Sequence, residues 1–499
     1  MFQPLLRVRA VGSRELFISP LSIFSTSCIM KLKCEYDTIP ARYFLFPYPF
    51  TGPKMSKIDH LLEYIHWITK LNVSPELAKE VDKTRLDLLN SLDNKGIQFA
   101  FNGTKPHIGA LSPGCLTCGQ GTWSCLYITG ACTANCFFCP QDPQGTIDRS
   151  PVAESIPFDD ADAYVEYLDK FAFKGVGFSG GEPLLRLDRV LTFLTKIKQR
   201  FGDSMYIWLY TNGDLVNEEI LRKLAAAGLN EIRFDIFVSD YDLKAVKMAR
   251  EFIKTVTVEI PSLPEDHEKL KERLPEMEKI GVNHLNIHQL VATEHNYKNM
   301  LAHEYTIFPP LAFRHCPIRG SEEASLRLLE YAADQGLSLP INFCTHVYKA
   351  RFQRLSRRNR AAPLVLESAE SVTNAGYIRR LSIQDTPEVI QKILSDCQKH
   401  APDGNLWALS EDKTNLIFDP SLIEKLDLGK RQLTLQYYEA DIVYRRANNA
   451  QKEVKLTAEK SVFIKRWMVS EQKGLNATDI LKHSSWERLD TGFPNLSSC

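Results

Sequence analysis

The stretch GACTANCFFCP, residues 130–140, places Cys132, Cys136 and Cys139 within eight positions, in the spacing C-x3-C-x2-C. Three thiols this close together indicate a metal site, but a closed structural zinc site usually has four protein ligands. A [4Fe–4S] cluster bound by three cysteines keeps one iron free for a ligand that is not protein. A zinc knuckle that borrows its fourth thiol, for example from Cys125, is the alternative.

The segments around this stretch alternate between short apolar runs and amphipathic helical patterns. The run WSCLYITG (123–130) ends directly before the cysteines, and five further runs follow between residues 174 and 291. Six strand–helix units predict a parallel sheet covered by helices. Six units are too few for an eight-fold barrel and fit a partial barrel or an open sheet. In both folds the cysteines follow the carboxyl end of the first strand, where α/β proteins bind ligands.

Two short motifs follow at the ends of the next two strands. GGEP occupies residues 180–183, and TNG occupies residues 211–213. Gly180 and Gly181 allow backbone amides to approach a ligand closely, and the carboxylate of Glu182 can accept from an ammonium group. Taken alone, GGEP is more often a turn that leads into a helix.

Together, these motifs carry a family resemblance. CTANCFFC, then GGEP about 40 residues later and YTNG on the next strand, resemble the radical S-adenosylmethionine (radical SAM) superfamily over roughly residues 120–300. The resemblance implies an α/β fold, a partial (β/α)6 TIM-like barrel. It also implies a [4Fe–4S] cluster, whose ligands would be Cys132, Cys136 and Cys139. The open iron of that cluster would chelate the amine and carboxylate of S-adenosylmethionine (SAM).

The resemblance also implies cofactor contacts for single residues around the cluster. Phe138 would pack near the adenine, and Gly180, Gly181 and Glu182 would meet the methionine amino group. Polar side chains on the third and fourth strands would reach ribose or methionine; they are Thr211, Asn212 and Asp235.

A further contact follows from the glycyl-radical activating enzymes, which the strand pattern resembles within the superfamily. Their last barrel strand carries a cofactor-contacting histidine, and His288 in NIHQL matches it. A lone histidine at a strand end is more often structural. The chain departs from these enzymes at Tyr210, where an acidic residue often stands, and in its greater length.

The implied activity is reductive cleavage of SAM to methionine and a 5′-deoxyadenosyl radical, which abstracts hydrogen from a substrate. An electron donor such as flavodoxin or ferredoxin would supply the electron. The sequence does not identify the substrate, and a peptide or protein is the first candidate. A radical SAM enzyme that modifies RNA and a non-catalytic cysteine-rich protein that binds zinc or Fe–S are the alternatives.

A second group of cysteines flanks the barrel. Cys115, Cys118 and Cys125 have the spacing C-x2-C-x6-C, and Cys344 stands in INFCTHVYK. Four thiols would complete a second metal site, either an auxiliary Fe–S cluster or a structural zinc. Auxiliary clusters are frequent in the superfamily, which favours Fe–S. Reduced cysteines without a metal are the alternative.

A basic segment, HVYKARFQRLSRRNR, occupies residues 346–360. Such a segment can bind phosphate or RNA. A charge run of this kind is more often a solvated helix face, and this one offers little aromatic surface for stacking bases. Nucleic acid is therefore not an expected partner.

The rest of the chain sets the domain organisation. Ser74 and Pro75 predict the start of a helix that ends near Asn94. The expected parts are a poorly defined N-terminal segment (1–54), a helical module and linker (55–114), the barrel (115–300), a barrel extension with the basic segment (301–374) and a C-terminal α/β domain (375–499).

Charge and hydropathy exclude other classes. The 61 basic residues balance the 61 acidic ones, so no global field attracts nucleic acid or membranes. No run approaches the roughly 18 apolar residues of a membrane span, and a cytoplasmic protein is expected. The first 30 residues, with three arginines and one acid, resemble a transit peptide. The preferred interpretation is an over-extended start, with Met30 as the initiator.

Overall fold

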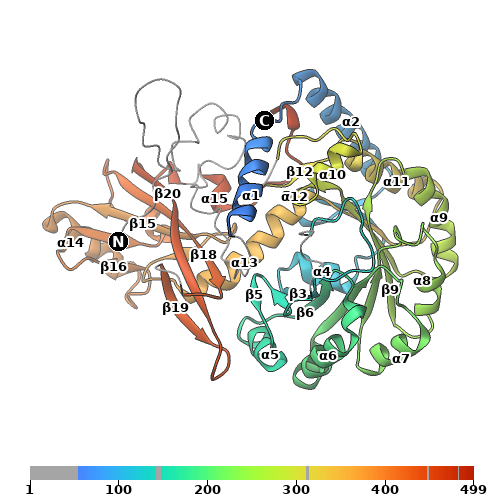
Figure 1. The fold of residues 1–499 in the computed structure, drawn as a ribbon. Helices are drawn as coiled ribbons and strands as arrows, with labels where there is room; N and C mark the ends of the chain where they lie inside the picture. The colour runs from blue at the N-terminus through green and yellow to red at the C-terminus, as the bar shows by residue number, and fades with distance from the viewer. Residues whose placement is uncertain (1–53, 142–147, 311–313, 447–448, 481–482, 499) are drawn as a thin grey trace, which may run out of the picture.

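The computed structural model describes residues 54–141, 148–310, 314–446, 449–480 and 483–498 (Figure 1). The expectations for the first 30 residues lie outside these ranges. None of the helices in the described ranges is long and apolar enough to cross a membrane.

Six parallel strands form the centre of the larger sheet, as the sequence predicts. They pair in chain order, each with the next. They are β3 (Trp123–Thr129), β6 (Gly175–Gly180), β7 (Tyr206–Thr211), β8 (Glu231–Phe234), β9 (Thr255–Ser262) and β10 (His284–Gln289). The mixed α/β fold with a large parallel sheet is thereby confirmed.

Further strands extend both edges of this sheet. Parallel β13 (Ile341–Cys344) pairs with β10, and antiparallel β2 (Lys105–Ile108) pairs with β13. The expected linker therefore contributes strands to the barrel sheet. The outermost strands are β1 (Gln98–Phe99) on one side, and β4 (Val152–Ala153) and β5 (Ile156–Pro157) on the other.

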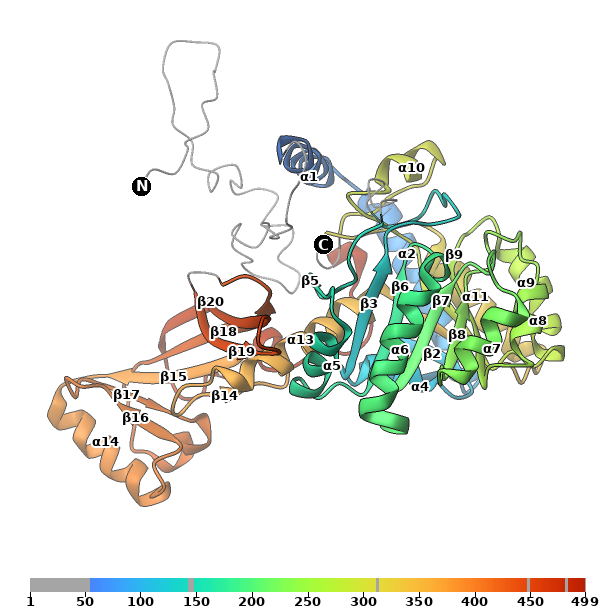
Figure 2. The same ribbon diagram turned by 60° about the horizontal axis from the view of Figure 1, so that its bottom comes forward.

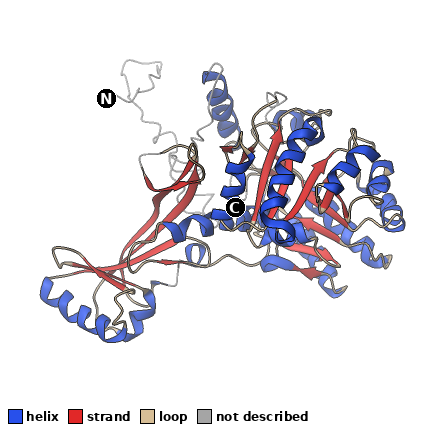
Figure 3. Ribbon diagram, turned by 90° about the horizontal axis from the view of Figure 1, so that it is seen from below, coloured by secondary structure: helices blue, strands red, loops and turns tan. Residues whose placement is uncertain are grey.

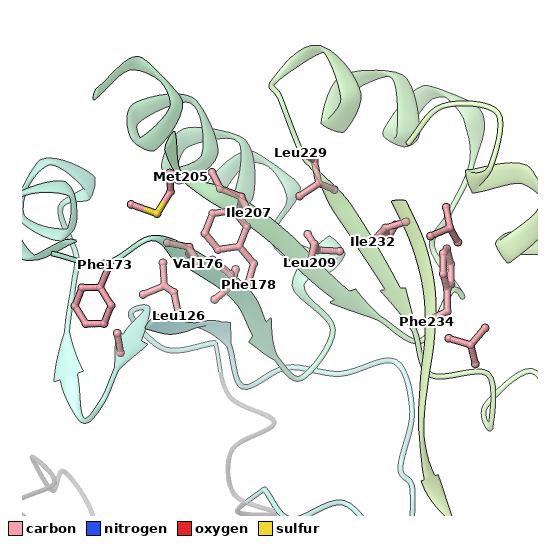
Figure 4. Close-up of a cluster of buried hydrophobic side chains, with 14 of the residues drawn as sticks. Leu126, Phe173, Val176, Phe178, Met205, Ile207, Leu209, Leu229, Ile232 and Phe234 are labelled. Carbon is pink, nitrogen blue, oxygen red and sulfur yellow. The ribbon is translucent and has the colours of Figure 1, made fainter. Parts of the chain in front are cut away.

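Helices cover the outer face of the sheet (Figures 1 and 2). They are α5 (Ala161–Lys170), α6 (Leu187–Phe201), α7 (Glu218–Ala226), α8 (Lys244–Ala249), α9 (His267–Lys279) and α11 (Ser321–Asp334). Apolar side chains fill the space between helices and strands, including the fully buried Val176, Ile207 and Leu209 (Figure 4). Each such side chain stabilises the fold by about 1.5–3 kcal/mol.

The N-terminal helices pack on the barrel. After α1 (Lys54–Ile68), the helix α2 (Pro75–Asn94) starts as the sequence predicts, since Ser74 Oγ accepts from Leu77 N at 3.1 Å. Arg85 of α2 forms an ion pair of 2.7 Å with Glu322 of α11. Two shorter helices follow, α3 (Ala100–Gly103) and α4 (Pro113–Gly119).

A second, antiparallel sheet forms the C-terminal part (Figure 3). Its strands are β14 (Ser371–Val372), β15 (Ile378–Gln384), β16 (Trp407–Leu409), β17 (Asn415–Phe418), β18 (Leu433–Val443), β19 (Ala450–Lys455) and β20 (Ser461–Leu475). The helices of this part are α14 (Pro387–His400) and α15 (Ser484–Glu487). Apart from β14, this sheet and its helices lie within the range expected for the C-terminal α/β domain, 375–499.

The basic segment lies between the two sheets rather than on a solvated face (Figure 1). It comprises α12 (His346–Tyr348), the π-helical turn η6 (Lys349–Gln353) and α13 (Arg354–Ala361). Arg357 donates to Asp441 of β18 at 3.0 Å, and Arg360 donates to Gly121 O at 2.6 Å. The expectation of a solvated charge run is therefore wrong, because Asp441 and Glu154 pair with Arg357 and Arg360, and Gly121 O accepts a further hydrogen bond from Arg360.

Candidate active site

The cluster loop, residues 130–141, follows β3 at the carboxyl end of the barrel. Of its three thiols, Cys132 is exposed and the other two are partly buried. Burial raises the pKa of Cys136 to about 12, and Asp235, Cys139 and Cys132 add to the shift in that order. The three predicted ligands lie in this loop, and Asp235, Cys139 and Cys132 are within electrostatic range of Cys136. Their role as cluster ligands stays a prediction.

The donor chemistry of these thiols fits an iron–sulfur cluster, in which each thiolate binds a separate iron. Within the described ranges, no three His, Cys, Asp or Glu side chains form a group that could hold one metal ion. Iron binding would also deprotonate the thiols.

Gly180 and Gly181 let the end of β6 lie against the start of the cluster loop. A Cβ atom on Gly180 would stand 2.3 Å from Thr129 O, and one on Gly181 would stand 2.1 Å from Ala131 O. Gly181 N donates to Thr129 O at 2.8 Å. The glycines are therefore required for backbone packing, and their predicted contact with methionine stays a prediction.

Glu182 joins the ends of β6 and β7. Its fully buried carboxylate accepts from Leu184 N at 3.0 Å, Thr211 Oγ1 at 3.0 Å and Asn212 N at 2.8 Å. Burial raises its pKa, while these donors oppose the shift. Glu182 thus holds the ends of the two strands together, and its predicted contact with an ammonium group stays a prediction.

The TNG motif anchors the cluster loop from the next strand. Asn212 Nδ2 donates to Thr133 Oγ1 at 2.8 Å, and Thr133 Oγ1 donates to Asp214 Oδ2 at 2.9 Å. Thr133 and Asp214 were missed by the sequence reasoning, although both adjoin the motifs. Thr211 and Asn212 thus hold protein groups, and their predicted contacts with SAM stay predictions.

Asp235 stands at the end of β8, next to the cluster loop. Its backbone N donates to Thr211 O at 2.9 Å, and its carboxylate accepts from Phe237 N at 3.1 Å. Burial raises its pKa to about 6. Its predicted role, to reach the ribose or the methionine, stays a prediction.

Asn296 fastens the cluster loop from the far side of the barrel mouth. Its Nδ2 donates to Phe138 O at 2.8 Å and to Val291 O at 3.2 Å, while Oδ1 accepts from Thr293 N at 2.7 Å. The ring of Phe138 packs edge-on against Phe237 at 4.8 Å. No sequence signal marks Asn296, because its partner lies 158 positions away.

His288 belongs to a polar network inside the barrel. Its Nε2 lies 2.6 Å from Glu259 Oε1, and its Nδ1 lies 3.3 Å from Lys349 Nζ. Burial and then Lys349 lower the pKa of His288. Burial alone would raise the pKa of Glu259. Arg233, whose Nη1 lies 2.6 Å from Glu259 Oε2, and His288 outweigh burial and hold this pKa well below its usual range. The role of His288 as a cofactor contact stays a prediction.

The second cysteine group also lies in this region, on three elements. Cys115 and Cys118 stand on α4, Cys125 on β3 and Cys344 at the end of β13. Helix α4 covers the inner face of the sheet, because a Cβ atom on Gly114 would stand 2.3 Å from the Arg233 side chain.

Comparisons with known proteins match this region. Residues 126–248 match the Radical SAM superfamily. The chain is 29% identical over 328 residues to a Methanocaldococcus jannaschii protein assigned by its name as a glycyl-radical enzyme activating enzyme, MJ0021. That match covers 63% of this chain and 84% of the relative.

Two other matches are shorter or weaker. A protein of the same archaeon assigned as a GTP 3′,8-cyclase is 36% identical over 113 residues, 22% of this chain and 35% of the relative. The solved structure of Streptococcus suis SuiB bound to precursor peptide SuiA has 14% identity and a TM-score of 0.34, covering 53% of this chain and 54% of that one. At that score the likeness carries no argument.

Proposed function

We propose that the chain generates a 5′-deoxyadenosyl radical for use on a peptide or protein. The premise is that it is a radical SAM enzyme with a [4Fe–4S] cluster and SAM as its cofactors. The observation that carries the proposal is the anchored cluster loop. Its three thiols are held together by contacts from β6, from the TNG motif and from Asn296.

In this proposal each residue near the loop has a defined task. Cys132, Cys136 and Cys139 would hold the cluster, which when bound supplies the electron that cleaves SAM. Glu182 keeps the ends of β6 and β7 in register and accepts from the methionine ammonium. Asp235 faces the same space from β8.

The remaining predicted contacts complete the binding site. Phe138 would pack near the adenine, and Thr211 and Asn212 would reach the ribose or the methionine. His288, held by Glu259 and Lys349, would face the substrate side of the barrel. Water has to be kept from the radical, and in this proposal the barrel wall would shield it.

A protein or peptide substrate is favoured by the relative from M. jannaschii. Its name assigns it to the activation of a glycyl-radical enzyme, which is a protein. RNA modification loses its main support, because Arg357 and Arg360 of the basic segment are engaged by Asp441, Glu154 and Gly121 O.

We further infer a low-potential electron donor such as flavodoxin or ferredoxin, which the exposed Cys132 side of the loop would face. A reducing compartment such as the cytoplasm is supported by the nine described cysteines, which all carry free thiols.

The first test is SAM cleavage without oxygen. Protein reconstituted with iron and sulfide is mixed with SAM and dithionite, and 5′-deoxyadenosine is quantified. A Cys132→Ala, Cys136→Ala, Cys139→Ala variant is expected to produce none, whereas Cys397→Ala, which removes a buried thiol of α14, is expected to match wild type. Equal production by the triple variant would refute the assignment.

The second test separates peptide from RNA. Deuterium from a perdeuterated peptide pool is expected to appear in 5′-deoxyadenosine, because the radical takes its hydrogen from the substrate. Perdeuterated RNA serves as the matched pool. Deuterium transfer from RNA alone would reject the peptide or protein substrate while leaving SAM cleavage intact.

A further inference from the structure

One ammonium group at the carboxyl end of the barrel has a histidine as its partner instead of a carboxylate. Lys349 is the first residue of the π-helical turn η6, which follows β13 and α12. Its Nζ lies 3.3 Å from His288 Nδ1. In the part of the chain that the structure describes, none of the ion pairs includes Lys349. Single π-helical turns are rare and occur frequently at functional sites, so this lysine is a candidate for a role in binding.

Hydrogen bonds behind His288 fix the charges of this pair. The Glu259 carboxylate accepts from Arg233 Nη1 at 2.6 Å and from Asn286 Nδ2 at 2.7 Å, and His288 Nε2 lies 2.6 Å from its other oxygen. Since Arg233 keeps Glu259 ionised, the carboxylate accepts the proton of His288 Nε2. Burial and then Lys349 lower the pKa of His288, and a neutral imidazole has one donor and one acceptor nitrogen. Nδ1 therefore accepts from the ammonium of Lys349, which keeps its charge.

The space beside this ammonium is open. The side chain of His288 is 31% exposed, whereas Asn286, which shares its face of β10, is 1% exposed. Lys349 is half-buried. An ammonium group has three N–H donors, and His288 accepts from one of them. Two donors are therefore available to a group that enters this space.

The surroundings of Lys349 are rich in basic groups. The ring centres of His315 and His346 lie 5.4 Å apart, and His346 N donates to a side chain at the end of β10 at 2.8 Å. Burial, His346, Lys349 and Arg314 lower the pKa of His315, so these three basic groups lie within electrostatic range of it. Glu294 lies 3.9 Å from Arg314 Nη1 and offsets that cation rather than Lys349. An anion that enters beside Lys349 therefore meets positive charge from several elements.

Lys349 also lies close to the proposed cofactor contacts. Glu259, which anchors His288, stands on β9, and Asp235 follows β8, the neighbouring strand. Burial raises the pKa of Asp235, Phe237 N opposes the shift, and Glu259 adds to it. The two carboxylates are therefore within electrostatic range of each other. A substrate group at Lys349 would face the same end of the barrel as SAM.

A substrate that fills this space removes the water around Lys349. An ammonium group that loses its water needs an anion, because its charge is otherwise costly to bury. In a peptide, the side chains of aspartate and glutamate supply such an anion. We propose that Lys349 binds an aspartate or glutamate carboxylate of the substrate and so selects acidic peptides or acidic protein segments. This selectivity presupposes the proposed function, because it names the substrate class of the same site.

Peptide selection by the holoenzyme tests the proposal. The perdeuterated peptide pool is separated by anion exchange into a fraction rich in aspartate and glutamate and a fraction without them, and part of the acidic fraction is converted to methyl esters. Each is mixed with reconstituted protein, SAM and dithionite, and deuterium in 5′-deoxyadenosine is quantified. Wild type is expected to take about 10- to 100-fold more deuterium from the acidic fraction than from its esters, because the contact joins two charged groups. The fraction without acidic residues keeps its terminal carboxylates and is expected to give as little as the esters.

Lysine variants assign the preference to one residue. Lys349→Met is expected to take deuterium equally from the acidic fraction and its esters, and Lys349→Arg should keep the preference because it keeps the charge. A purely structural defect would lower the transfer from both pools and leave their ratio unchanged. Lys298→Met is the matched control, because it removes an exposed ammonium of α10 (Tyr297–Ala302) that pairs with Glu63 at 2.9 Å. Its ratio should match wild type.

The proposal is overturned if wild type takes deuterium equally from the acidic fraction and its esters, if it prefers the fraction without acidic residues, or if folded Lys349→Met keeps the wild-type ratio. It is also overturned if Lys349→Met loses SAM binding, measured by equilibrium dialysis, to the same extent as transfer, because the ammonium would then serve the cofactor. Each of these results leaves a peptide or protein substrate standing. No transfer from any peptide pool would reject that substrate and the selectivity together. The comparison of pools in wild type needs no variant, so it decides the question even if Lys349→Met does not fold.

Discussion

Replacing Asn296 with alanine is expected to loosen the cluster loop. The side chain is fully buried, and its amide joins Phe138 O, Val291 O and Thr293 N. Asn296→Ala leaves buried carbonyl and N–H groups without partners, each at a cost of about 1–3 kcal/mol. Since two groups lose a short bond, we expect a local loss of about 2–6 kcal/mol, or roughly 30- to 25,000-fold in the equilibrium that holds the loop in place.

The assay is the rate at which a chelator removes iron from the reconstituted protein, together with SAM cleavage. Asn299→Ala is the matched control, because Asn299 lies in α10 (Tyr297–Ala302), the helix that Asn296 directly precedes, but is exposed and donates to Phe137 O at 3.2 Å. It should lose less than about 1 kcal/mol. If both variants release iron and cleave SAM equally, Asn296 does not position the loop.

Three further predictions follow from the same structure. Gly181→Ala should abolish stable cluster binding, because its Cβ would stand 2.1 Å from a carbonyl oxygen of the loop. Gly336→Ala, whose Cβ would have no atom within 4 Å, should lower stability without loss of iron. An equal iron content per chain in the two reconstituted variants would contradict this prediction. Burial, His346, Lys349 and Arg314 lower the pKa of His315 to about 3. Between pH 7 and pH 5 the unfolded chain therefore binds a proton that the folded chain does not, and acidification over this range should lower the free energy of unfolding by about 2 kcal/mol. Urea titrations at the two pH values should show this loss in wild type and not in His315→Gln. Arg357→Ala breaks a forked contact with Asp441 and should lower the melting temperature without changing RNA binding; an RNA affinity that falls with this substitution would revive the RNA alternative.

The predicted class, fold and cofactors could be read from local features. The C-x3-C-x2-C spacing, GGEP and TNG lie in single loops, and strand–helix alternation is visible along the chain. The predicted resemblance agrees with the match of residues 126–248 to the Radical SAM superfamily, and the predicted parallel sheet is confirmed. The start of α2 was likewise predictable, because Ser74 caps it within three residues.

What the sequence could not show depends on partners far apart in the chain. Asn296 and Phe138 meet only after the barrel closes. The short strand β2 contains Pro106 and pairs antiparallel with β13, more than 200 residues later. The basic segment has the composition of a solvated helix, and only the folded chain brings Asp441 to Arg357.

The cluster loop is anchored from parts of the chain that lie far apart in sequence. Gly181 N and Glu182 N, just after β6, donate to Thr129 O and Ala131 O, Asn212 donates to Thr133, and Asn296 donates to Phe138 O. A substitution about 80 or 160 residues away from the cysteines can therefore change the loop as directly as a substitution next to them.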